Sequence, residues 1–184
     1  HALGLAKLAC NVAALLGERD ILRGAGADLH SRLALLTGEM RAARGVQGGV
    51  SRARQLARQF HGYLQRRAAV NPPADPEHPR WLGALLAFAY PDRIARKRRE
   101  AGAEYRLANG RAALFSEPDA LMKHSWLVIA DLGSRQGQRE ERIYLAAELD
   151  EQLFEHELSE LVSQHDVLDW DEREGLLRAE RQAR

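Results

Sequence analysis

Cysteine is almost absent from this chain: Cys10 is the only one among 184 residues. An intramolecular disulfide is therefore excluded, and a reducing cytoplasm is the expected location. Cys10 lies in an apolar segment, which favours a buried small side chain over a reactive thiol. Long apolar runs are also lacking, since no stretch approaches the roughly 20 residues of a membrane span. The apolar start lacks the basic residues and cleavage site of a signal peptide, so we expect no membrane partner.

Motifs for enzyme chemistry are missing as well. The phosphate-binding pattern Gly-x-x-x-x-Gly-Lys-Ser/Thr does not occur, so we expect no ATPase site and no cofactor in this chain. His156 and Glu157 resemble the start of a zinc-hydrolase motif, but Glu160 stands where its second histidine belongs. No Ser, His and Asp set has local support for nucleophilic catalysis. We therefore predict neither catalytic nor metal-binding residues.

Lysine is scarce, and the charges are unevenly distributed. Only Lys7, Lys97 and Lys123 are lysines among the 27 basic residues. Residues 1–100 hold 17 Lys and Arg against 8 Asp and Glu, and residues 101–184 hold 10 against 18, so the halves carry +9 and −8. Halves of opposite sign indicate two modules, with the basic one facing a polyanion.

Apolar residues at helical spacing dominate the N-terminal part. They predict helices over residues 3–16 and 50–67. Asp28 is placed to cap a further helix that Gly38 ends. We therefore expect residues 1–70 to form a helical bundle.

A proline-dense connection follows at residues 71–79, where regular helix and strand are excluded. Helical patterns then cover residues 80–89 and, after Tyr90-Pro91, residues 92–99. The second of these helices would place three bases on one side: Arg93, Arg96 and Lys97. Residues 71–102 are thus predicted to be a linker with junction helices.

The apolar period changes to that of strands after Gly102. Residues 104–107 and 112–115 flank Asn109-Gly110, which predicts a hairpin with a type I′ turn. Residues 126–132 and 142–147 are expected to form two more strands.

The end of the chain adds a predicted helix from Asp150 to about Val162 and a last hairpin over residues 167–179. Residues 103–184 are therefore expected to form a small Greek-key barrel with one inserted helix, of which the oligonucleotide-binding (OB) fold is the commonest example. The predicted fold class is α+β, with an N-terminal α-helical bundle followed by an OB-fold-like β-barrel.

Ten bases gather on the third helix and just after the linker: Arg52, Arg54, Arg58, Arg66, Arg67, Arg93, Arg96, Lys97, Arg98 and Arg99. Clustered cations bind nucleic acid by displacing counterions from its phosphates. Ordinary solvated helix faces, some paired with the acidic half, are the alternative. Spacing by itself does not decide between the two.

Several passages together resemble one family, the bacterial DEAH-box helicases called HrpB. The most specific are Tyr-Pro-Asp-Arg-Ile-Ala at residues 90–95 and Asn-Gly-Arg at residues 109–111. Residues 3–24, 126–132 and 142–147 support them. The resemblance covers nearly the whole chain in order.

This resemblance implies an accessory part of an ATP-dependent RNA helicase: its helical ratchet-like domain and a C-terminally truncated barrel. In such helicases these parts close over two RecA-like motor domains and complete a channel for single-stranded RNA or DNA. The motor, with its ATP and Mg²⁺, is expected to precede His1. The chain alone should therefore be inactive, whereas the longer protein is expected to be a hydrolase.

Carried onto this sequence, the resemblance implies nucleic-acid contacts at Arg54, Arg58, Arg93, Arg96, Lys97, Asn109 and Arg111. The alternative for Arg93 is a salt bridge that joins the domains, and for Arg111 a brace of the turn. The predicted barrel is acidic, so either its Arg106–Arg111 edge alone faces the strand or a second hypothesis applies. In it the chain is a scaffold that docks on the motor or on a partner protein.

Overall fold

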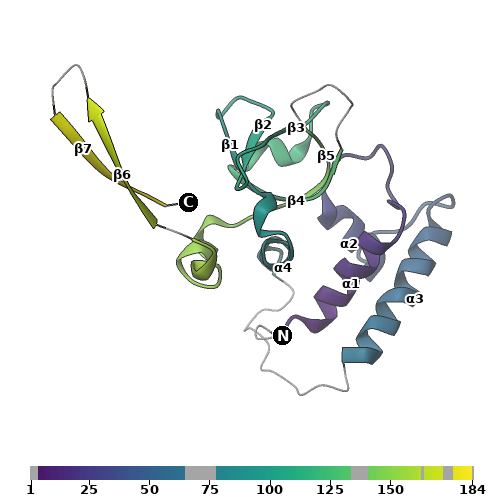
Figure 1. Cartoon of the computed structure of the whole chain (residues 1–184). Coiled ribbons are helices and arrows are strands. Elements are labelled where there is room, and N and C mark those ends of the chain that lie inside the picture. Colours follow the sequence, from purple (N-terminus) through teal and green to yellow (C-terminus); the bar gives the residue numbers. More distant parts are fainter. Residues whose placement is uncertain (1–3, 65–77, 134–140, 163, 172–175, 184) are drawn as a thin grey trace. The chain divides into compact units, whose positions relative to one another are not determined.

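The computed structural model describes residues 4–64, 78–133, 141–162, 164–171 and 176–183, with side chains as far as residue 162 (Figure 1). The chain divides into two compact units, residues 1–150 and 151–184. The first unit contains helices and a β-barrel, which confirms the predicted α+β class with its helical and barrel parts. The predicted division at residues 70 and 102 stays a prediction.

Four α-helices occupy the first unit: α1 (Ala6–Gly17), α2 (Leu29–Thr37), α3 (Gln47–Leu64) and α4 (Arg80–Ala89). All four were predicted from apolar spacing. The Asp28 side chain caps α2 by accepting hydrogen bonds from the backbone N–H groups of His30 and Ser31. Gly38 ends α2 in a left-handed conformation, with φ +96°. None of the helices in the described ranges is long and apolar enough to cross a bilayer.

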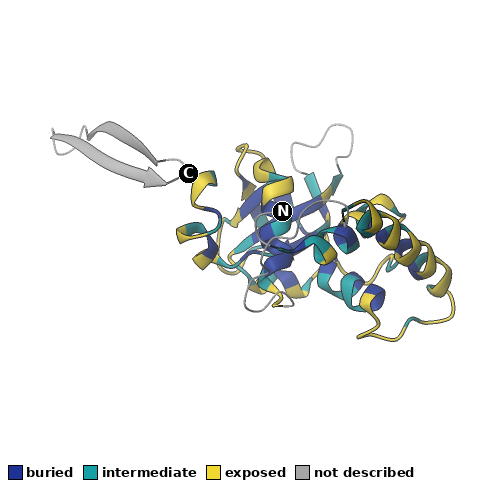
Figure 2. Ribbon diagram, turned by 90° about the horizontal axis from the view of Figure 1, so that it is seen from below, coloured by how far each residue is buried: buried dark blue, intermediate teal, exposed yellow. Residues whose placement is uncertain are grey.

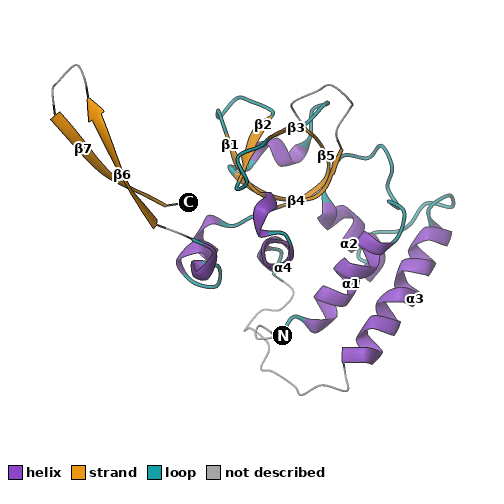
Figure 3. Cartoon of the chain, viewed as in Figure 1, coloured by secondary structure: helices purple, strands orange, loops and turns teal. Residues whose placement is uncertain are grey.

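Five strands close the barrel: β1 (Ile94–Lys97), β2 (Glu104–Leu107), β3 (Ala112–Leu114), β4 (Trp126–Gly133) and β5 (Glu141–Glu148). Their order around the barrel is β1-β2-β3-β5-β4, and only β3 and β5 pair in parallel (Figures 1 and 3). Alternate residues such as Tyr105, Leu107, Leu127 and Ile129 form the barrel's core. Figure 2 shows this buried interior in dark blue. A 3-10 turn, η2 (Ala120–Lys123), precedes β4.

The helix predicted over residues 92–99 is wrong. The segment forms a 3-10 turn, η1 (Pro91–Arg93), and then strand β1, which pairs with both β2 and β4. Pairing on both sides satisfies the backbone polar groups of β1 and leaves the barrel without an open edge. These long-range hydrogen bonds outweigh a weak helical charge pattern, so the three bases do not share one helix face.

The hairpin between β2 and β3 is confirmed, but its turn is not of type I′. That turn requires positive φ at both central residues, and only Gly110 has it, at +87°. The backbone N–H of Gly110 donates to the carbonyl of Leu107 (2.9 Å), and the N–H of Leu107 donates to the carbonyl of Arg111 (2.9 Å). The result is a three-residue loop with one left-handed glycine.

The second unit also differs from expectation. Two 3-10 turns, η3 (Glu151–Glu155) and η4 (Ser159–Leu161), replace the predicted α-helix. An α-helix would bring the like charges of Glu151 and Glu155 together at i, i+4 spacing. The last hairpin exists, as β6 (Gln164–Asp171) and β7 (Leu176–Ala183), but it forms a separate two-stranded sheet. Strand β1 completes the five-stranded barrel instead.

Arg32 is the one buried charged residue among the described side chains, with 2% of its surface exposed. Its Nε and Nη2 atoms donate to the two carboxylate oxygens of Asp20, at 3.1 and 2.9 Å. The remaining donors reach the carbonyls of Asp28 and Leu22. Burial alone would raise the pKa of Asp20, but the hydrogen bonds from Arg32 and Leu22 and the charge of Arg32 hold that pKa below its ordinary value.

Helix α4 approaches the barrel closely at Gly83, where a Cβ atom would lie 2.2 Å from the backbone oxygen of Glu148. We expect Gly83→Ala to lower the free energy of unfolding by about 2–3 kcal/mol, because backbone must move to admit the methyl group. Gly62→Ala is the matched control, since nothing lies within 4 Å of its Cβ position in α3. That variant should gain about 0.5 kcal/mol. Urea unfolding measures both, and equal effects would contradict the packing.

Asp20 should make stability depend on pH. Because its pKa is lowered on folding, its contribution is complete above the unfolded value of about 3.9 and is lost as the pH falls through the folded value. We expect Asp20→Asn to cost about 1–2 kcal/mol at pH 7, a figure reduced because a third of the carboxylate side chain is exposed. The difference from the unmodified chain should shrink in urea unfolding at pH 3. Glu117→Gln, at an exposed position, is the control and should change little.

Candidate nucleic-acid interface

A groove of about 410 Å³ lies between α1, the end of α2 and α3. Its basic lining residues are Lys7 from α1 and Arg54, Arg58 and His61 from α3. The α3 residues follow one another at i, i+4 and i+7, so they form one stripe along the helix. Among the described residues no Asp or Glu lines the groove, and this lining is therefore suited to an anion.

Arg54 lines this groove and also joins α3 to α2 by hydrogen bonds. Its Nε donates to the carbonyl of Leu36 (2.7 Å), and its Nη2 donates to the carbonyl of Leu35 (3.0 Å). Both carbonyls belong to the last turn of α2, where no partner within the helix is available. Arg54 thus holds α3 against the end of α2, and its guanidinium is partly occupied by that role.

Arg58 and Lys7 are exposed at the same groove. Neither forms an ion pair within the part of the chain that the structure describes. Their charges therefore face solvent without a counterion among the described residues. Cys10 lies beneath them as a buried side chain, as predicted, and burial raises the pKa of its thiol.

The predicted site residues near the barrel have individual roles. Arg93 donates from Nη1 to the carbonyl of Ala130 (2.8 Å) and lies over the ring of Tyr90, 4.7 Å from its centroid. It therefore joins η1 to β4 by contacts other than a salt bridge. Lys97 donates from Nζ to the carbonyl of Met122.

Asn109 and Arg111 both stabilise the β2–β3 hairpin. The side-chain oxygen of Asn109 accepts a hydrogen bond from the backbone N–H of Arg111 (3.0 Å). The guanidinium of Arg111 forms an ion pair with Glu141, with 2.9 Å between Nη1 and Oε1. These contacts correspond to a brace of the turn.

Arg96 differs from these residues because it is exposed on the outside of the barrel. Its guanidinium lies 5.4 Å from the ring centroid of Trp126. Directly opposite it on β2 stands Arg106, also exposed. The structure thus brings Arg54 and Arg58 together at the helices and places Arg96 on a separate barrel face.

Sequence reasoning missed several members of these two surfaces. Lys7 and His61 belong to the groove, and Trp126 belongs to the barrel face beside Arg96. Arg106 belongs to the barrel edge that the sequence offered as one alternative, and its place between the inward-facing Tyr105 and Leu107 directs its side chain outward. Lys7 gave no such signal, since only the packing of α1 on α3 brings it to the groove.

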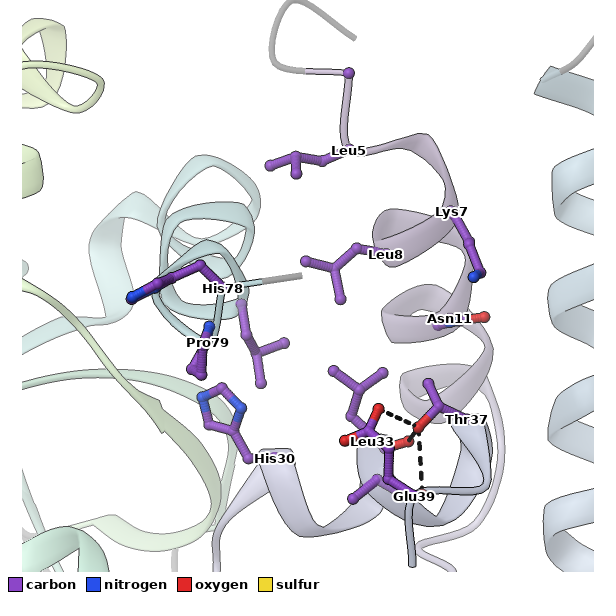
Figure 4. Close-up of a pocket in the computed structure, with 13 residues that line it drawn as sticks. Leu5, Lys7, Leu8, Asn11, His30, Leu33, Thr37, Glu39, His78 and Pro79 are labelled. Carbon is purple, nitrogen blue, oxygen red and sulfur yellow. Dashed lines mark hydrogen bonds between the residues drawn. The ribbon is translucent and has the colours of Figure 1, made fainter. Parts of the chain in front are cut away.

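A second cavity, of about 390 Å³, lies between α1, α2 and the start of α4. Figure 4 shows Leu5, Leu8 and Leu33 along its apolar wall. The Nε2 atom of His30 is buried there without a hydrogen-bond partner among the described residues. Within the same ranges no group of three metal-ligating side chains occurs. The cavity therefore combines an apolar wall with several polar side chains, among them Lys7, Glu39 and His78.

The negative charge lies mostly outside the barrel strands. Residues 94–150, which contain β1 to β5, hold 10 Lys and Arg against 9 Asp and Glu, a net charge of +1. Residues 151–184, the second compact unit, hold 4 against 10, a net charge of −6. Most of the acidic excess expected for the barrel therefore belongs to the second unit.

A family model, a related sequence and solved structures all show a similarity between this chain and HrpB. Residues 161–184 match the family described as "ATP-dependent RNA helicase HrpB, connector region". Over 98 residues, 53% of this chain, the sequence is 39% identical to the ATP-dependent RNA helicase HrpB of Escherichia coli strain K12. The predicted resemblance to HrpB is confirmed.

Solved structures of HrpB agree with the sequence match. The crystal structure of the E. coli DExH-box NTPase HrpB superposes with a TM-score of 0.70, at 28% identity over 99% of this chain. That of the Escherichia coli DEAH/RHA helicase HrpB superposes with a TM-score of 0.63, at 27% identity over 96%. The chain spans 12% of the curated HrpB and about a fifth of the solved ones.

Arg54 and Arg58 should separate in a stability measurement. We expect Arg54→Ala to lower the free energy of unfolding by about 1–2 kcal/mol, because two α2 carbonyls lose a charged donor. Arg58→Ala, four residues along the same helix, should change it by less than about 0.5 kcal/mol. Thermal unfolding followed by circular dichroism measures both variants. A larger loss for Arg58→Ala would contradict the assigned roles.

Proposed function

We propose that this chain is an accessory region of an ATP-dependent RNA helicase and guides single-stranded nucleic acid past RecA-like motor domains of the same protein. The basic groove between α1 and α3 carries the proposal. Lys7, Arg54, Arg58 and His61 line it, and its described lining contains no Asp or Glu, a composition that favours a phosphate backbone. The confirmed resemblance to helicases supports nucleic acid as the ligand.

The groove would bind the nucleic-acid backbone without recognising the base sequence. Exposed guanidinium and ammonium groups bind phosphates irrespective of base, so a strand can move along them. A moving motor requires such contacts, because a tight base-specific contact would hold the strand in place. Arg54 would act chiefly by fixing α3, and Arg58 with Lys7 would meet the phosphates.

ATP hydrolysis is assigned to the motor. The chain lacks the Gly-x-x-x-x-Gly-Lys-Ser/Thr pattern that holds a nucleotide's phosphates. ATP and Mg²⁺ would therefore be bound by the RecA-like domains, and this chain would contribute only contacts to the strand. Its place of action would be the cytoplasm.

Residues 151–184 favour a second, different function, which is docking on the motor or on a partner protein. Their net charge of −6 opposes contact with nucleic acid, and residues 161–184 match the HrpB connector region. In this proposal the acidic unit contacts protein while the helices and barrel contact the strand.

A binding titration tests the strand-guiding function. Fluorescein-labelled U12 RNA is titrated with the 184-residue chain at 50 and 200 mM salt, and fluorescence anisotropy is followed. We expect Lys7→Ala/Arg58→Ala to weaken binding about tenfold and to reduce the salt slope by about 1.4, because two phosphate contacts are lost. Arg23→Ala/Arg44→Ala removes the same charge at exposed positions outside the groove and should have a much smaller effect. Equal losses in the two doubles, or no binding at 50 mM salt, would refute the groove.

A further inference from the structure

Two arginines face each other on the outside of the barrel. Arg96 on β1 pairs in register with Arg106 on β2. On the neighbouring strands, Arg96 pairs with Trp126 of β4 and Arg106 pairs with Ala112 of β3. These four residues form one row across the outside of the barrel. Their strand neighbours, among them Tyr105 and Leu127, belong to the barrel's core. Strand alternation therefore directs Arg96 and Arg106 outward, where both are exposed.

Like charges at directly opposite strand positions repel each other and destabilise a sheet. Neither Arg96 nor Arg106 forms an ion pair within the ranges that the structure describes. The carboxylate that shares their strand face, Glu104, is bound by Arg98, with 2.5 Å between Nη1 and Oε1. The folded chain thus supplies no described counterion for this pair, although the row would be more stable with one.

The Arg96 side chain is already held in position. Its guanidinium lies over the half-buried ring of Trp126, 5.4 Å from the centroid. Stacking on an aromatic face restricts the long side chain and leaves the N–H groups at the guanidinium edge able to donate. On the other side of Arg106, the small Ala112 leaves the row open.

We propose that Arg96 and Arg106 form a second subsite, which binds a phosphate of the single-stranded nucleic acid where the strand crosses β1 and β2. This inference rests on the proposed function and adds a barrel-side contact to it. Paired guanidinium groups bind a phosphate by several N–H donors at once. A protein partner is disfavoured, because the centre of a protein interface is depleted of charged residues, and Arg96 and Arg106 share this face with the charged Arg98 and Glu104.

The subsite has a signature that a structural role would not give: loss of affinity together with a gain of stability. We expect Arg106→Thr to weaken U12 RNA binding about 5- to 10-fold and to reduce the salt slope by about 0.7. Without RNA, its melting temperature should rise by about 1–3 °C, because the repulsion from Arg96 is removed. Lys123→Thr is the control, as it removes one exposed base of the barrel unit outside this row. It should show neither change.

The outcomes separate this inference from the proposed function. Unchanged affinity for Arg106→Thr, alongside a loss for Lys7→Ala/Arg58→Ala, would refute the subsite and leave the groove standing. Unchanged affinity for both would refute the two together. A lower melting temperature would mean that Arg106 only braces the barrel. Competition by a 12-residue poly-glutamate peptide as strong as that by unlabelled U12 RNA would assign the face to acidic protein and likewise refute the subsite.

Discussion

The hydrogen bonds accepted by the Asp119 carboxylate are the interactions on which the packing of the first unit depends. Its Oδ2 accepts a hydrogen bond from the backbone N–H of Ala27 (2.7 Å), and its Oδ1 accepts one from that of Leu121 (2.9 Å). The carbonyl of Ala27 in turn accepts from the N–H of Ala146 on β5 (2.8 Å). One short segment between α1 and α2 is therefore held to the barrel from two sides. Gly26, with φ +76°, allows this approach, since a Cβ there would lie 3.0 Å from the Asp119 carboxylate.

The hydrogen bonds around Asp119 connect the basic groove to the barrel. Asp28, next to Ala27, caps α2, and the far end of α2 is bound by Arg54 of α3. The basic groove is thus connected to the barrel by successive hydrogen bonds. On the barrel side, Tyr105 is buried between the strands and donates to the carbonyl of His124 (2.8 Å). Burial and the charge of Asp119 raise the pKa of Tyr105 to about 12, so the phenol stays protonated and can donate.

Local signals predicted much of this fold, and long-range pairing decided the rest. The cap at Asp28 and the left-handed Gly38 set the ends of α2 by contacts within a few residues, which a sequence pattern displays. Strand β1 has no such signal, because its partners β2 and β4 lie elsewhere in the chain. For the same reason the bases on α3 were predictable, whereas the opposition of Arg96 and Arg106 was not, since it depends on the register of two strands.

Net charge also proved a poor guide to which bases face a ligand. The sequence places 27 Lys and Arg in the chain, yet the structure uses many of them internally. Arg32 is buried on Asp20, Arg54 and Arg93 bind carbonyls, and three more form exposed or half-exposed ion pairs: Arg52, Arg98 and Arg111. Binding a polyanion requires bases whose charge is not already neutralised. Within the described ranges Lys7 and Arg58 meet that condition at one groove, and Arg96 and Arg106 meet it at facing strand positions. Other exposed bases, such as Arg23 and Lys123, meet it without belonging to either surface. The arrangement of uncompensated charge, more than its amount, therefore defines where a strand would bind.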